Sequence, residues 1–157
     1  MTDTERYPFT NFNFAVEISV PGISPEICRA SFQECDGLEM TMEVKTIREG
    51  GNNSQQIRLN GPVSYGQLSL KRGMSPDFDL WRWFSVALAS GKERTRGEAL
   101  VVMFASDGTT ERARFKLSRC LPVKMKAPAL NGKDGTIAIE EMQIAYEQLT
   151  LASPGES

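Results

Sequence analysis

A single stretch of this chain, residues 75–91, has the pattern of an amphipathic helix, whereas most of the remainder alternates like β-strand. Ser75 can cap this helix, Pro76 suits its first position, and Gly91 can close its C-terminus. At about 100° per residue, the large apolar side chains fall on one face. We expect that face to lie in the core, and its members are Leu80, Trp81, Trp83, Phe84 and Leu88.

The strand pattern is longest between Leu38 and Arg48, and apolar and polar residues alternate in it from Leu38 to Lys45. At about 3.4 Å per residue this strand spans roughly 35 Å, more than one small domain has to cover. A glycine-rich tip follows, and residues 56–72 return as the second strand. We expect the apolar side chains of the first strand to face the subunit interior, namely Leu38, Met40, Met42 and Val44.

Other segments support a β-sheet architecture. Residues 12–20 alternate as a half-buried strand, and residues 100–104 are apolar on both faces, which predicts a central strand. Asp107-Gly108 is typical of a hairpin turn. In residues 136–151 the apolar parity changes, which predicts a bulge near Glu140-Glu141. The expected fold is an antiparallel β-barrel or sandwich with one flanking helix and a long protruding hairpin.

Composition limits the possible functions. The chain has 157 residues, a formal net charge of −2, three cysteines and no histidine. We expect one domain, with no basic field for sequence-specific nucleic-acid binding. No apolar run approaches the roughly 20 residues of a membrane span, and the first ten residues lack a charged-then-apolar pattern, so we expect neither a membrane span nor a classical signal peptide. Without histidine, the commonest general base and zinc ligand are missing, so we expect no enzyme activity.

Individual chemical motifs are weak as well. Glu140 and Glu141 are adjacent on a strand and point to opposite faces, so they cannot easily act as a pair. Gly50-Gly51 lacks the lysine and helix of a phosphate-binding loop. The thiols, Cys28, Cys35 and Cys120, have no histidine to activate them. We therefore expect no catalytic residue, no cofactor and no metal site.

Four segments together are recognisable: FQECDGLEMTMEVKTIREGGNN, LNGPVSYGQLSLKRG, LWRWF and IAIEEMQIAYEQLTL. In this order they resemble the tail tube proteins of contractile phage tails and related contractile injection systems. The resemblance runs from Asn11 to Leu151, and Gly50-Gly51 and residues 70–73 are its most specific parts. Asn60 stands where the family often has proline, and Tyr146 where it often has histidine.

The resemblance implies one tail tube domain over residues 1–157, with an N-terminal arm at 1–11 and a flexible tail at 152–157. It also implies a structural subunit that forms hexameric rings, which stack into a tube around a channel for cargo protein or DNA. The implied partners are further copies of the chain, sheath proteins and baseplate proteins. Assembly would take place in the bacterial cytoplasm, and the product would be a phage tail or a released injection particle.

The hairpin carries the residue-level expectations. Its tip should contact the next ring through Arg48, Glu49, Gly50, Gly51, Asn52 and Asn53. Its polar face should line the channel through Glu39, Thr41, Glu43 and Lys45. The alternative is a β-barrel that binds a small ligand or carbohydrate, in which Trp81 and Trp83 would line the pocket.

Overall fold

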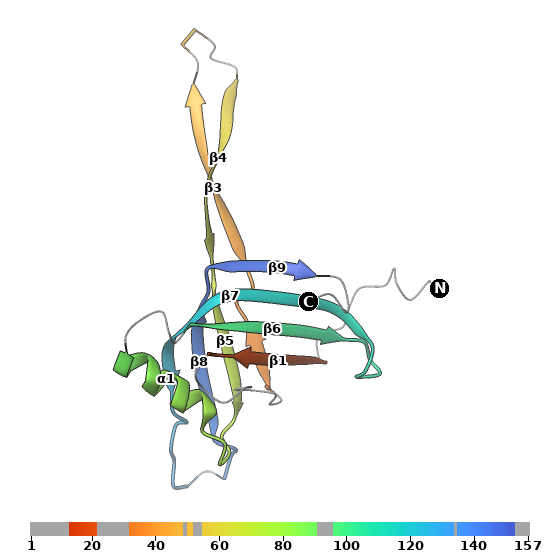
Figure 1. Cartoon of the computed structure of the whole chain (residues 1–157), viewed down its shortest axis with the longest axis vertical. Coiled ribbons are helices and arrows are strands. Elements are labelled where there is room, and N and C mark those ends of the chain that lie inside the picture. The colour runs from red at the N-terminus through yellow and green to blue at the C-terminus, as the bar shows by residue number, and fades with distance from the viewer. Residues whose placement is uncertain are drawn as a thin grey trace.

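The computed structural model describes residues 13–21, 32–48, 50–51, 55–90, 96–133 and 135–152. These residues form nine strands and one helix, α1 (Asp79–Ser90) (Figure 1). The strands are β1 (Phe14–Ser19), β2 (Glu34–Asp36), β3 (Met40–Arg48), β4 (Gln56–Tyr65), β5 (Gln67–Gly73), β6 (Gly97–Phe104), β7 (Glu111–Lys126), β8 (Ile139–Ala145) and β9 (Gln148–Ala152).

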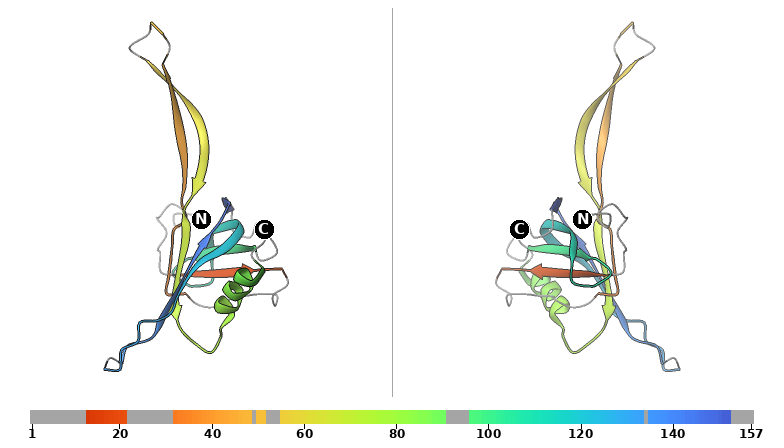
Figure 2. Two further views of the ribbon diagram at one scale, coloured as in Figure 1. Left: turned by 90° about the vertical axis from the view of Figure 1, so that its left-hand side faces the viewer. Right: turned by 90° about the vertical axis from the view of Figure 1, so that its right-hand side faces the viewer.

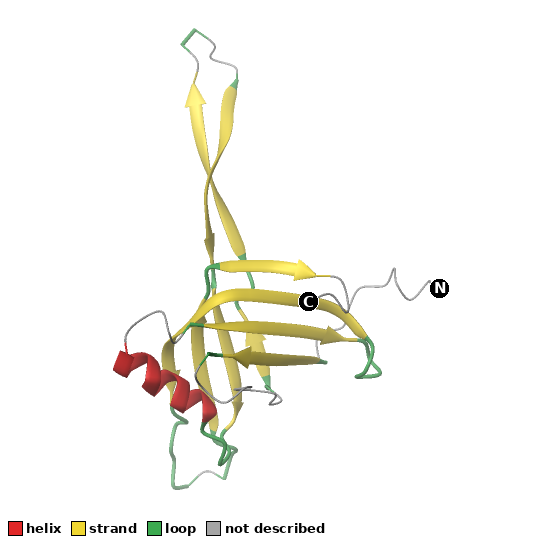
Figure 3. Ribbon diagram, viewed as in Figure 1, coloured by secondary structure: helices red, strands yellow, loops and turns green. Residues whose placement is uncertain are grey.

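The body of the subunit is a sandwich of two antiparallel layers that share the long strand β7. The first part of β7 pairs with β6 and β9, and its last part pairs with β8. The path β1-β6-β7-β8-β5-β2 ends in two edges, so the sheet is not closed into a barrel. Arg119, at φ 55°, marks the passage of β7 from one layer to the other. The two sets of strands cross one another in Figures 1 and 3.

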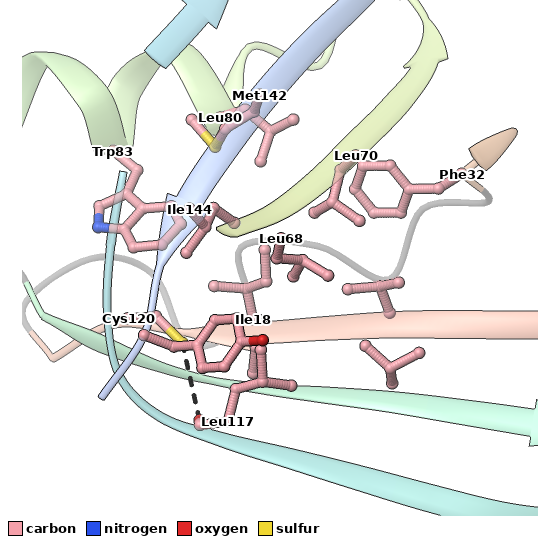
Figure 4. Packing of buried hydrophobic residues seen from close by; sticks show 14 of the residues in the cluster. Ile18, Phe32, Leu68, Leu70, Leu80, Trp83, Leu117, Cys120, Met142 and Ile144 are labelled. Carbon is pink, nitrogen blue, oxygen red and sulfur yellow. Dashed lines mark hydrogen bonds between the residues drawn. The ribbon is translucent and has the colours of Figure 1, made fainter. Parts of the chain in front are cut away.

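The core lies between these layers and beneath α1. Alternate residues of the strands point into it, as the half-buried pattern requires. Figure 4 shows side chains from β1, β5, β8 and α1 directed toward one another. Their exposed fractions are 1% or less, and examples are Ile18, Leu68, Leu70, Leu80, Trp83, Met142 and Ile144. Each such side chain contributes about 1.5–3 kcal/mol of burial free energy.

The helix differs from its sequence prediction in where it begins and in one residue of its apolar face. It begins at Asp79, because the Arg82 amide donates to the Phe78 carbonyl at 2.9 Å and closes the first turn there. Leu80 and Trp83 are buried, and Trp81 and Phe84 are half-buried. The assignment of Leu88 to the core is wrong, since its side chain is 73% exposed.

The C-terminal strand pattern divides into β8 and β9, with the break at Tyr146-Glu147. The predicted bulge near Glu140-Glu141 is wrong, because β8 pairs with β5 in unbroken register from Ile139 to Ala145. The parity of the buried residues changes only after Tyr146, between β8 and β9. Glu140 is 1% exposed and shares the inward parity of Met142 and Ile144. Ile137, which the sequence placed in this strand, lies outside it and is 77% exposed.

The hairpin of β3 and β4 projects from one end of the body in every view (Figures 1 and 2). All nine residues of β3 are exposed. Met40, Met42 and Val44 are 61%, 47% and 52% exposed, so the expectation that they face the subunit interior is wrong. Leu38, just before the strand, does pack partly against the core. The expected arm at 1–11 and residues 153–157 of the expected tail lie outside the described residues.

Candidate functional site: the projecting hairpin and its root

The hairpin is an isolated two-stranded ribbon. Its ladder runs from the pair Met40 and Tyr65 to the pair Arg48 and Gln56. Within the described part of the chain, β3 and β4 pair with each other and with no other strand. A two-stranded ribbon is marginally stable in water, and its outer edges present unpaired backbone groups. The stability of the hairpin therefore depends on how it is anchored to the body and on which surface binds its free edges.

The anchor is Tyr146, which follows β8 and is 5% exposed. Its hydroxyl donates to the Gly37 carbonyl at 2.7 Å and accepts from the Glu39 amide at 3.0 Å. Its ring lies 5.7 Å from that of Tyr65, at the other strand of the hairpin. One side chain of the body thus holds both strands where they leave it.

Two glycines make this root compact. Gly37 has φ of +99°, and a Cβ there would lie 1.9 Å from the Gln67 carbonyl oxygen. A Cβ at Gly66 would lie 2.5 Å from Cγ of Glu39. The Gly66 amide also donates to the Glu39 carbonyl at 3.1 Å. Glycine is required here because the backbones approach too closely for a side chain.

Burial raises the pKa of Tyr146 above its ordinary value, against a smaller lowering by the hydrogen bond from the Glu39 backbone. The low-dielectric surroundings disfavour the tyrosinate, so the hydroxyl keeps the proton that it donates to Gly37. The raised pKa means that this contribution to stability is complete below the unfolded-state pKa, about 10. It is lost as the pH rises through the higher folded-state value.

A buried ionic cluster fixes the opposite side of the body. Arg72 of β5 donates from Nε to Glu140 Oε1 at 2.9 Å and from Nη2 to Asp79 Oδ1 at 2.7 Å. The Trp81 indole donates to Glu140 Oε2 at 2.8 Å. Arg72 also lies over the Phe32 ring, 5.7 Å from its centroid. This cluster joins β5, β8 and the start of α1.

Sequence reasoning missed the cluster, although the signal was present. Alternate residues of β5 point inward, and Arg72 continues the series of Leu68 and Leu70. In β8, Glu140 likewise lies two residues before the inward-pointing Met142. A charged residue at an inward position requires a partner of opposite charge. Two such positions of opposite sign on different strands predict that the strands are neighbours, and β5 and β8 do pair.

The described residues offer little for the alternative functions. Burial raises the pKa of the Cys35 and Cys120 thiols to about 12, which makes both poor nucleophiles; Cys28 lies outside the described residues. Trp83 is fully buried, and the Trp81 indole is bound to Glu140, so neither is free to line a ligand pocket. In the ranges that the structure covers, no three cysteine, aspartate or glutamate side chains form a metal-binding group, and no helix could cross a membrane.

The expected contact and channel residues all map to the hairpin. Arg48 ends β3, and Gly50 and Gly51 form the turn at the tip, with Gly51 at φ +91°. Glu49, Asn52 and Asn53 lie outside the described residues. The four expected channel residues are exposed on β3 or just before it, namely Glu39, Thr41, Glu43 and Lys45. The structure of one subunit does not test these expectations. The inter-ring contact of the tip and the channel position of Glu39, Thr41, Glu43 and Lys45 stay predictions.

Comparison with known proteins decides the family. Residues 10–150 match the family described as T4-like virus tail tube protein gp19. The chain belongs to this tail tube family. A search of curated protein sequences finds no significant match.

Solved structures share the tail tube fold at low sequence identity. A chain of the anti-feeding prophage baseplate is 23% identical, with a TM-score of 0.79 over 96% of this chain and 99% of that chain. A chain of the sheath-tube complex of an extracellular contractile injection system, PVC, in the extended state is 17% identical, with a TM-score of 0.75 over 94% and 93%. Hcp1 from Salmonella typhimurium is 12% identical, with a TM-score of 0.52 over 90% and 87%.

Removing the cation of the buried cluster should destabilise this tail tube fold strongly. We expect Arg72→Met to lower the free energy of unfolding by about 3–5 kcal/mol, because it leaves Glu140 and Asp79 buried without their cation. The matched control is Lys71→Met, whose partner Glu34 lies 3.5 Å away at an exposed pair; its effect should stay below about 1 kcal/mol. Equal effects in urea denaturation would contradict the importance of the buried cluster.

Removing the Tyr146 hydroxyl should loosen the root of the hairpin. We expect Tyr146→Phe to cost about 1–3 kcal/mol, because the Glu39 amide and the Gly37 carbonyl lose their partner. Amide hydrogen exchange should become faster at Glu39 while the amides of β6 keep their protection. Tyr65→Phe is the control, since it leaves the Tyr146 hydrogen bonds in place. Unchanged exchange at Glu39 would show that the hydroxyl does not hold the root.

Proposed function

We propose that the chain is the structural subunit of the inner tube of a contractile injection system or phage tail. Copies form hexameric rings, the rings stack, and the hairpin of each copy reaches the adjacent ring. Family membership supports the tube, and the 6-fold symmetrised baseplate and the sheath-tube complex with similar chains support the assembly. The proposal includes no enzyme activity, because the family is one of structural proteins.

The projecting hairpin is the observation that carries this proposal. At about 3.3 Å per residue, the nine residues of β3 reach roughly 30 Å beyond the root. Among the described strands the ribbon pairs with none beyond itself, and its exposed apolar side chains are costly in water. A contact between the hairpin of one copy and the body of another is heterologous, and such a contact continues along an axis when its rotation does not close into a ring. A tube is the expected product.

Partners and location follow from the same assignment. The tube would join a baseplate at one end and lie within a sheath, since chains of a baseplate and of a sheath-tube complex share this fold. Cargo protein or DNA would pass through its lumen. The subunits would assemble in the bacterial cytoplasm and then form part of a phage tail or an extracellular particle.

Shortening the hairpin tests the proposed function. We expect deletion of two facing pairs, Ile47 with Ile57 and Arg48 with Gln56, to leave the body folded and to stop tube elongation. The deletion keeps the register of the remaining ladder and removes roughly 7 Å of reach. Circular dichroism would follow folding, and negative-stain micrographs with length distributions would follow assembly.

Wild-type protein in the same conditions is the reference, with baseplate proteins added where nucleation requires them. Tubes of normal length from the shortened variant would contradict the bridging role of the hairpin. Wild-type protein that remains monomeric at every concentration and with its partners present would contradict the proposed function itself.

A further inference from the structure

The hairpin contains a bulge near the middle of its ladder. Met42 pairs with Val63 and Val44 pairs with Asn60, so the single residue Glu43 faces both Gly61 and Pro62. A Cβ at Gly61 would lie 2.5 Å from the Glu43 carbonyl oxygen, which explains the glycine. Proline fits the neighbouring position because a bulge residue makes no ladder hydrogen bond through its amide.

The bulge moves the apolar residues from one face of the ribbon to the other. Between the root and the bulge, Met40 and Met42 share a face with Val63. Between the bulge and the tip, Ile47 pairs with Ile57, and Leu59 lies on the same face as both, because alternate residues of a strand share a face. That face is opposite to the face of Met40 and Met42, because Ile47 lies an odd number of residues from both in β3 and neighbouring strand residues point to opposite faces. All six side chains are 41–61% exposed.

The twist of the ribbon compensates for this switch. In Figure 1 the two strands cross about midway along the hairpin, so β3 and β4 exchange sides. A ribbon whose strands exchange sides shows one face below the crossing and the other face above it. The bulge changes the apolar face at the middle of the ladder, and the twist turns the new face in the direction of the old one. The six apolar side chains therefore lie on one side of the hairpin, which we name the apolar side.

The opposite side, here named the polar side, is hydrophilic along its whole length. Its charged members are Glu43 near the bulge and Arg58 and Arg48 near the tip, and Thr41, Ser64 and Thr46 lie between or below them. Each side has one exception: Val44 next to the bulge lies on the polar side, and Lys45 lies on the apolar side. A long aliphatic stem lets a lysine cover apolar surface while its ammonium group stays in water.

We propose that the apolar side of the hairpin is the surface that packs against a second copy of this chain, and that the polar side faces the channel. This inference rests on the proposed function and specifies its contact. A second copy is the occupant because the chain belongs to a tail tube family and shares its fold with chains of a 6-fold symmetrised baseplate and of a sheath-tube complex. An exposed apolar stripe on a ribbon with two free edges also requires a partner that offers both apolar surface and backbone groups, such as a neighbouring sheet.

The channel then has a different chemistry from the one that strand parity alone predicts. Glu43 remains channel-facing, but Lys45 turns toward the neighbouring copy, and Arg48 and Arg58 take its place. Acidic and basic positions then alternate along the axis of the tube, with Glu43 at the bulge and Arg48 and Arg58 nearer the tip of each hairpin. A lumen with both signs has no long run of one charge to hold a passing polymer.

Two substitutions on neighbouring residues separate the sides. Ile57→Thr with Leu59→Thr removes apolar surface from the tip half of the apolar side, and Arg58→Thr, between them, changes the polar side. We expect the double variant to raise the critical concentration for tube formation at least about tenfold, because the lost apolar contact is worth 1.4 kcal/mol or more. Arg58→Thr should change it less than about twofold. Circular dichroism of the monomers would establish that every variant is folded.

A labelling experiment gives the same answer without depending on the assembly of a variant. Ile57→Cys or Arg58→Cys chains are mixed at low fraction into wild-type tubes and treated with a maleimide, with wild-type tubes as the background for native thiols. Cysteine at position 57 should react at least about ten times more slowly in tubes than in monomers, and cysteine at 58 should keep most of its rate. Protection of cysteine at position 58 with free reaction of cysteine at position 57 would overturn the inference, and so would loss of assembly with Arg58→Thr alone. Either result would leave the proposed function of the wild-type chain as a tube subunit standing. Absence of wild-type tubes would overturn it together with the proposed function.

Discussion

A two-stranded ribbon cannot bury both of its faces and pair both of its edges within one subunit, and this constraint governs the whole tail tube chain. The hairpin formed by β3 and β4 carries seven exposed apolar side chains and has no other described strand beside it. Such an element is marginally stable alone. Its conformation in the monomer depends on the root, and in the proposed tube other copies would cover its free surfaces.

The body is built to hold that ribbon in a defined direction. The Tyr146 hydroxyl bonds to Gly37 and Glu39, and close backbone contacts at Gly37 and Gly66 leave the root little freedom. On the far side of the sandwich, Arg72 ties β5 to β8 and to the start of α1 through buried carboxylates. A buried ion pair of this kind specifies which elements meet, even where its net contribution to stability is small. The sandwich thus positions the hairpin of its own subunit.

Sequence periodicity predicted much of this fold because the half-buried strands obey it. Val16 and Ile18 alternate inward in β1, and α1 places Leu80 and Trp83 in the core as expected. The same signal was misread in β3. Met40 and Met42 have the parity of core residues, but periodicity reports that a face is apolar and does not report which molecule covers it. Leu88 was misassigned for a similar reason, since it has the spacing of the apolar face of α1 but its side chain is 73% exposed.

Other features depend on long-range geometry that one sequence does not display. The contact between Arg72 and Glu140 joins residues 68 positions apart, and it follows from the pairing of β5 with β8. The helix starts at Asp79 because its carboxylate is drawn to Arg72 and accepts the Leu80 amide, whereas local capping preferences favoured Ser75. The bulge opposite Glu43 decides which residues share a side of the hairpin, and neither strand alone reveals it.

The central claim is that the hairpin is completed by neighbouring copies. Hydrogen exchange of the β3 and β4 amides in monomers and in assembled tubes tests it most directly. We expect fast exchange along both strands in the monomer, except next to the root, and strong protection along the ladder in the tube. The amides of β6, which already lie between β1 and β7, should be protected equally in both states. Equal exchange of the hairpin amides in monomers and tubes would contradict the account.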